Sequence, residues 1–150
     1  METHSKLLTA FWGTNITLEA CVLLPWGFDA HPNAFQQARL FNLRAYKHIL
    51  EQNLVAGYET LLKARKLAKK GGNTMALAES FRLEGLILDL SGEHARALEA
   101  LNKSLAAFIE VNSDNALLVY SAMGNVYMSL QNYEMMLQLG QNFLAAAQRL

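Results

Sequence analysis

A short pattern recurs three times at a nearly constant interval along this chain. Each copy has an aromatic residue, a small residue four positions later and a bulky residue three positions after that. The copies begin at Phe41, Phe81 and Tyr120, so they lie 40 and 39 residues apart. A period of this length is typical of repeat arrays, in which each repeat is one small unit and the stacking of units supplies the core.

From residue 33 onward, the apolar residues recur at helical spacing, and no segment alternates like a half-buried strand. Asn33 is a suitable N-cap, the pair Gly71-Gly72 is a suitable helix stop, and Asn73 or Thr74 is suited to cap the next helix. The expected helices cover about 34–52, 54–70, 75–90, 93–111, 116–130 and 133–149.

These helices form three pairs with very short turns inside each pair. Because so short a turn leaves no room for a crossover, each pair is expected to be an antiparallel hairpin. A hairpin cannot bury its apolar faces alone, so the hairpins should stack side by side. The sequence therefore predicts one all-α domain, a right-handed α-hairpin solenoid with repeats at about 33–72, 73–112 and 113–150.

Residues 1–32 are expected to form an N-terminal part that packs on the solenoid. Apolar residues between 7 and 24 have helical spacing, and we expect a packed helix there; the alternative is a targeting or membrane-spanning segment. Residues 25–32 contain both prolines of the chain and are expected to form a loop. Its Trp26 and Phe28 are expected to be buried anchors, the alternative being an exposed recognition tip.

In the third repeat, Tyr120, Met123, Gly124 and Tyr127 resemble the signature of the tetratricopeptide repeat family. The second repeat matches fairly and the first is degenerate, and the resemblance covers about residues 34–150. Two features depart from the family pattern: the period is 39 to 40 rather than 34 residues, and the terminal proline of each repeat is missing. Long repeats of this kind resemble those of bacterial signalling regulators. The other matching positions are Ala45, Leu54, Gly57, Leu61 and Ala64 in the first repeat, and Phe81, Glu84, Gly85, Leu88, His94, Ala97, Leu101 and Ser104 in the second.

Small residues of this pattern have a physical role. Gly85, Gly124, Ala97 and Ala64 are expected where the two helices of a pair approach closely, because a larger side chain there would push the helices apart.

The resemblance implies a non-enzymatic module that binds a protein or peptide, as the sensory or docking domain of a bacterial signalling or regulatory protein. In this family the first helix of each pair lines a concave groove. Guanidinium and amide groups in such a groove are suited to hold a peptide main chain or a carboxylate, the alternative being a merely solvated face. Carried onto this sequence, the groove positions are Arg39, Asn42, Tyr46, Glu79, Arg82, Leu86, Asp89, Leu118, Ser121, Asn125 and Met128.

Composition and motifs argue against several other functions. Thirteen basic and thirteen acidic residues cancel, so no global field favours nucleic acid or an acidic membrane. The lone Cys21 excludes an internal disulfide and fits a reduced, cytoplasmic setting. None of the four histidines has metal-ligand spacing, and His94 occupies the position of Tyr133 in the next repeat, which favours packing. We expect no metal, no cofactor and no enzyme; an enzyme with an unrecognised groove site is the alternative.

Two surfaces remain open to interpretation. A basic cluster near the end of the second expected helix is most simply a solvated helix terminus, the alternative being a contact for an acidic partner or nucleic acid. The last expected helix is rich in leucine, whereas an end repeat normally has a polar face. Either the chain belongs to a longer protein with an output domain, or this helix meets a second subunit in a self-contained adaptor or dimer. The residues concerned are Lys63, Arg65, Lys66, Lys69 and Lys70 in the cluster, and Leu137, Leu139, Phe143, Leu144 and Leu150 in the last helix.

Overall fold

The structure, a computed structural model, describes residues 33–149, and this part of the chain is built from α-helices without a strand. Every helix predicted after residue 33 is present, with ends that differ from the expected ones by at most two residues. The helix expected at 7–24 and the loop expected at 25–32 lie outside the described residues. The helices are α3 (Ala34–Leu50), α4 (Leu54–Gly71), α5 (Thr74–Leu90), α6 (His94–Glu110), α7 (Ala116–Ser129) and α8 (Tyr133–Ala147).

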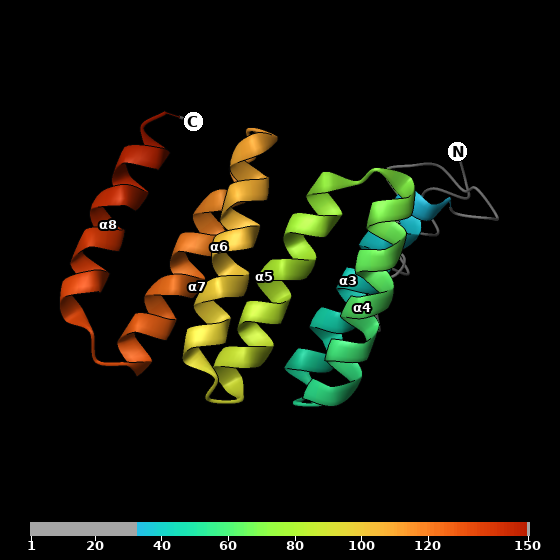
Figure 1. Cartoon of the computed structure of the whole chain (residues 1–150), viewed down its shortest axis with the longest axis horizontal. Helices are drawn as coiled ribbons and strands as arrows, with labels where there is room; N and C mark the ends of the chain where they lie inside the picture. Colours follow the sequence, from blue (N-terminus) through green and yellow to red (C-terminus); the bar gives the residue numbers. More distant parts are fainter. Residues whose placement is uncertain (1–32, 150) are drawn as a thin grey trace, which may run out of the picture.

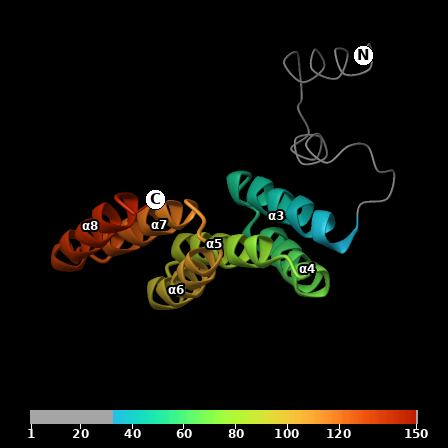
Figure 2. The same cartoon turned by 90° about the horizontal axis from the view of Figure 1, so that it is seen from above.

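Consecutive helices form antiparallel pairs that stack into an elongated array, with α3 and α4 at one end and α8 at the other (Figure 1). The first helices of the pairs, α3, α5 and α7, contact one another in order, whereas α4, α6 and α8 make no contact among themselves. The first helices therefore lie closer to one another than the second helices do. Their row forms the inner side of the array (Figure 2). The predicted all-α hairpin solenoid is confirmed.

The helices end in the same way in every repeat. After each of α3, α4, α5, α6 and α7, one residue adopts a left-handed conformation with φ between 50° and 79°. The next amide then donates to the carbonyl five residues earlier, as Asn53 does to His48 and Glu93 to Leu88. This is the hydrogen bond of the Schellman motif, which turns the chain back within two residues. The left-handed residues are Gln52, Gly72, Gly92, Asn112 and Gln131.

Asparagine begins most of these helices. Asn33 and Gln36 form a capping box, in which each side chain accepts a hydrogen bond from the other residue's amide. The side chains of Asn53, Asn73 and Asn132 accept from the amide three residues later. The predicted caps at Asn33 and Asn73 are confirmed, as is the helix stop at Gly71-Gly72.

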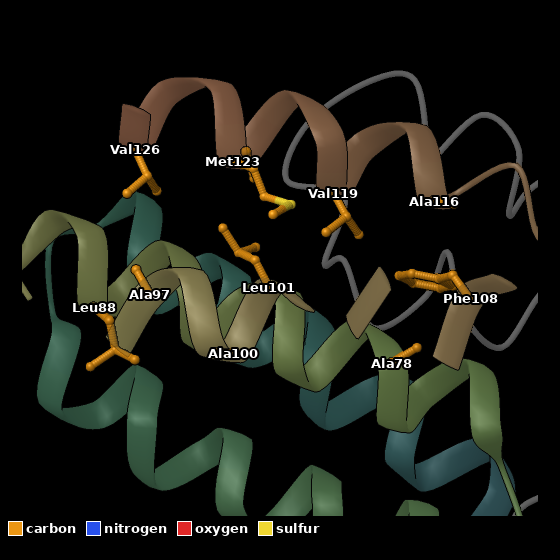
Figure 3. Packing of buried hydrophobic residues seen from close by; sticks show 11 residues of the cluster. Ala78, Leu88, Ala97, Ala100, Leu101, Phe108, Ala116, Val119, Met123 and Val126 are labelled. Carbon is orange, nitrogen blue, oxygen red and sulfur yellow. The ribbon is translucent and has the colours of Figure 1, made fainter. Parts of the chain in front are cut away.

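The core is continuous through α5. One cluster joins α3, α4 and α5 around Leu61 and Leu83, and a larger one joins α5, α6 and α7 around Leu101 and Phe108. In the larger cluster Leu101 points toward Val119 and the neighbouring side chains of α7, which passes over it (Figure 3). Burial of these aliphatic side chains is worth roughly 1.5–3 kcal/mol each, so stacking of the hairpins supplies the main stabilisation.

A glycine allows α5 and α6 to approach closely. A methyl group added at Gly85 would lie 2.6 Å from Cγ and 2.7 Å from Cδ2 of Leu101, a fully buried side chain. The equivalent glycine of the next repeat differs, since a methyl group at Gly124 would meet only Cδ2 of Leu139, at 3.8 Å. The predicted close approach holds at Gly85, whereas Gly124 has room for a side chain.

This contrast predicts opposite effects of two matched substitutions. Gly85→Ala should destabilise the fold by about 1–3 kcal/mol, because Leu101 must move within a packed core. Gly124→Ala should be neutral or stabilising by up to ~1 kcal/mol, because alanine favours the helix and fits the space. Urea unfolding of both variants, followed by circular dichroism, measures the two free energies, and similar values would contradict the packing difference.

A buried asparagine ties the first repeat to the second. Asn73 caps α5 through its Oδ1, while its Nδ2 donates to the carbonyl oxygen of Phe35 in α3 at 2.9 Å. Ser104 makes a comparable link inside the second repeat, donating from α6 to the carbonyl of Ala78 at 2.8 Å. Both side chains are buried, so each bond also satisfies a polar group that would otherwise be costly inside the core.

Replacing Asn73, which has both roles, should lower the free energy of unfolding more than replacing a residue that is only a helix cap. Asn73→Ala should lower the free energy of unfolding by about 2–3 kcal/mol, because a cap and a buried hydrogen bond are lost together. Asn53→Ala is the matched control, since Asn53 is an exposed cap, and it should cost ~1 kcal/mol. Equal losses in urea unfolding would show that the link to Phe35 contributes nothing.

Candidate functional site

A cleft of about 650 Å³ lies on the inner side of the array and is lined by residues of α3, of α5 and of the start of α7. It brings together six of the groove positions expected from the sequence: Arg39, Asn42, Tyr46, Glu79, Arg82 and Leu118. These residues belong to all three repeats and lie up to 79 positions apart in the sequence. The cleft therefore exists because the hairpins stack. Its size is within the range of sites that bury a small ligand or a few residues of a peptide.

The other expected positions do not line this cleft. Leu86 packs against both core clusters, so it joins the two halves of the fold. Oδ1 of Asp89 lies 2.8 Å from Nδ1 of His94, within hydrogen-bond distance, across the turn between α5 and α6. Ser121, Asn125 and Met128 are exposed on α7, beyond the lining of the cleft.

Arg82 and Glu79 form a two-pronged ion pair along α5. The Nε of Arg82 donates to Oε2 of Glu79 at 2.9 Å, and its Nη2 donates to Oε1 at 2.6 Å. Burial acts to lower the pKa of Arg82, but the hydrogen bond and the charge of Glu79, with a smaller contribution from Tyr46, raise it overall. The guanidinium is therefore always charged and is fixed in direction, and its Nη1 is not used by the pair.

Asn42 lies at the base of the cleft and has a structural bond. It is buried, and its Nδ2 donates to the carbonyl oxygen of Ala76 in α5 at 2.8 Å. One N–H of this amide thus ties α3 to α5, while the residue also lines the cleft as expected. Its Oδ1 has no hydrogen-bond partner among the described residues.

Three apolar residues of the cleft were not among the groove positions expected from the sequence. Phe35 and Leu43 from α3 and Met75 from α5 line it, together with Leu118, which is 52% exposed. Helical spacing carried the available signal, since Phe35, Arg39, Leu43 and Tyr46 follow one another at intervals of four, four and three residues along one face of α3. The cleft thus combines exposed apolar surface with oriented charges.

The basic cluster on α4 is smaller than the sequence suggested. Arg65 is half-buried, and its guanidinium lies 4.2 Å from the centre of the Phe81 ring and donates to Glu84 at 2.7 Å. This residue holds α4 against α5 and is not available to a partner. Only the lysines of the cluster remain exposed, namely Lys63, Lys66, Lys69 and Lys70.

No group of three or more His, Cys, Asp or Glu side chains in residues 33–149 is arranged to hold a metal ion. Within the same residues, no helix has both the length and the apolar character needed to cross a membrane. Comparisons with protein-family models, with curated proteins and with solved structures found no match to this chain.

Proposed function

We propose that the protein is a non-enzymatic docking module that binds a short protein or peptide segment in the cleft between α3, α5 and α7. The observation that carries this proposal is the cleft itself, in which apolar side chains and a fixed guanidinium share one concavity of about 650 Å³. Sites for ligands commonly combine an apolar lining with a few oriented polar groups.

The charges of the lining indicate which segment would fit. Among the described residues of the lining, Glu79 and Arg82 form an ion pair that fixes the direction of the guanidinium. Arg82 can bind a carboxylate through Nη1 while Glu79 keeps it in place. The apolar lining on either side suits a large apolar side chain. The favoured ligand is therefore a segment with an acidic residue close to an apolar one.

A selection experiment with matched variants tests this function. Random peptides displayed on phage are selected on the immobilised chain, and the affinity of the selected peptides is measured by fluorescence anisotropy. We expect the selected peptides to combine acidic and apolar residues. The double variant Glu79→Gln/Arg82→Gln should weaken their binding at least tenfold, or about 1.4 kcal/mol, because it removes the charges but keeps side chains of similar size.

The control is the equivalent double variant on α6. Glu93 and Arg96 form an ion pair with the same three-residue spacing, and both are exposed outside the cleft. Glu93→Gln/Arg96→Gln should leave affinity unchanged. Equal weakening by both double variants, or by neither, would place the peptide elsewhere and refute the cleft as the binding site.

A further inference from the structure

Lysines gather on the exposed face of α4, at one end of the array (Figure 1). None of their ammonium groups has an ion pair or a hydrogen bond among the described residues. The one acid of α4, Glu59, is exposed and makes no ion pair among the same residues. The positive charge of this face is therefore uncompensated. The lysine face, as we call it, consists of Lys63, Lys66, Lys69 and Lys70.

The dipole of α4 explains only part of this charge. A helix dipole favours cations in the last turn, where Lys69 and Lys70 lie, and its effect falls off beyond that turn. Lys66 and Lys63 lie five and eight residues before the end of the helix at Gly71. Lys66 also has the other three lysines at intervals of three, three and four residues, at which like charges repel. A partner of opposite charge would relieve this repulsion.

The rest of the array has the opposite charge. Residues 73–149 contain eight acidic and four basic residues. An extended polyanion such as a nucleic acid, lying along the array, would meet this negative part after the lysine face. The lysine face therefore suits a short acidic partner better than a long one.

Two apolar side chains lie on the same side of α4 as the lysines. Val55 is 72% exposed and Leu62 is 48% exposed. With Glu59, Lys66 and Lys69 they follow one another at intervals of four, three, four and three residues, which is the spacing of residues along a contact between two helices. A nucleic acid backbone offers these side chains no apolar partner, whereas a helix can present carboxylates and an apolar residue together.

The groups of α4 that are suited to read a nucleic acid are already engaged. The guanidinium of Arg65 donates to Glu84 and lies over the ring of Phe81, and the hydroxyl of Tyr58 donates to the same carboxylate at 3.4 Å. Since α4 contains no other arginine and no other aromatic residue, it has no free fork for base edges and no free ring for base stacking. The same contacts show that α4 already packs against one helix that presents a carboxylate, namely α5.

We propose that the lysine face of α4 binds an acidic helix of a partner protein. An apolar residue of that helix packs on Leu62, and carboxylates on either side of it lie beside Lys63, Lys66 and Lys69. This surface is distinct from the cleft of the proposed function, because no residue of α4 lines the cleft.

Fluorescence anisotropy of a labelled synthetic helix with the full chain tests the contact. The peptide is about three heptads long, with leucine along one stripe and glutamate on both sides of it. Lys63→Gln/Lys66→Gln should weaken its binding at least about tenfold, and Leu62→Gln at least about threefold, because charges and an apolar contact are lost respectively. The control is Lys47→Gln/Lys103→Gln, which removes the same charge from exposed positions on α3 and α6 and should leave affinity unchanged.

Thermal unfolding gives a second readout that needs no partner. Lys66→Gln should raise the midpoint of unfolding of the free chain, because it removes the repulsion from three neighbouring lysines, whereas Lys103→Gln should not. A variant that is more stable and binds less has lost a binding group and has kept its fold. A midpoint that falls in Lys66→Gln would contradict the repulsion and overturn the proposal.

Three other outcomes also overturn it. The first is a lack of binding by the peptide, or equal binding by a version with glutamine in place of each glutamate. The second is a DNA duplex of similar length that binds as tightly as the peptide, which would make the face a general polyanion site. The third is weakening by Glu79→Gln/Arg82→Gln but not by the lysine variant. That result would place the peptide in the cleft and leave the proposed function intact.

Discussion

The described fold depends on how closely other helices approach α5. This helix contacts α3, α4, α6 and α7, and the two larger core clusters both include it. Close approach is possible because the contacts are made at Gly85 and at small buried residues such as Ala76 and Ala78. Where helices come this near, side chains from the neighbours reach the α5 backbone: Asn42 bonds to the carbonyl of Ala76 and Ser104 to that of Ala78. These links add direction to packing that is otherwise non-directional.

The sequence predicted the fold well because its signals are local and repeated. Helical spacing located the helices, and asparagine and glycine located most of their ends. The left-handed turn positions were harder to find. Gly72 was evident, but Gln52 and Gln131 adopt the same conformation without any favourable preference, since left-handed backbone normally selects glycine or asparagine. Only the period identifies them, because both align with Gly92.

The candidate site was predicted only in part, because its contacts connect distant residues. Arg65 was grouped with nearby lysines, and its partner Glu84 is 19 positions away on another helix. Asn42 was placed in the groove by register, but the register does not show that one N–H of its side chain donates to the carbonyl of Ala76. Positions on α7 failed to join the cleft for a similar reason. Register places Ser121 and Asn125 on a face of a helix, but the stacking of neighbouring hairpins decides which part of that face is enclosed.

Equivalent positions in the second helices of the repeats make different kinds of contact along the array. Tyr58 and Arg65 use polar bonds to join the first two hairpins, whereas Leu98 and Leu105 join the next two by apolar packing. The geometry of the position is thus conserved in space although its chemistry changes. In α8 the chemistry follows the apolar version while the face is exposed. The inner cleft differs from this face, because its apolar residues lie beside an ion pair. Permanent burial of an ion pair carries a desolvation cost. A ligand that can leave the cleft is therefore favoured over permanent packing.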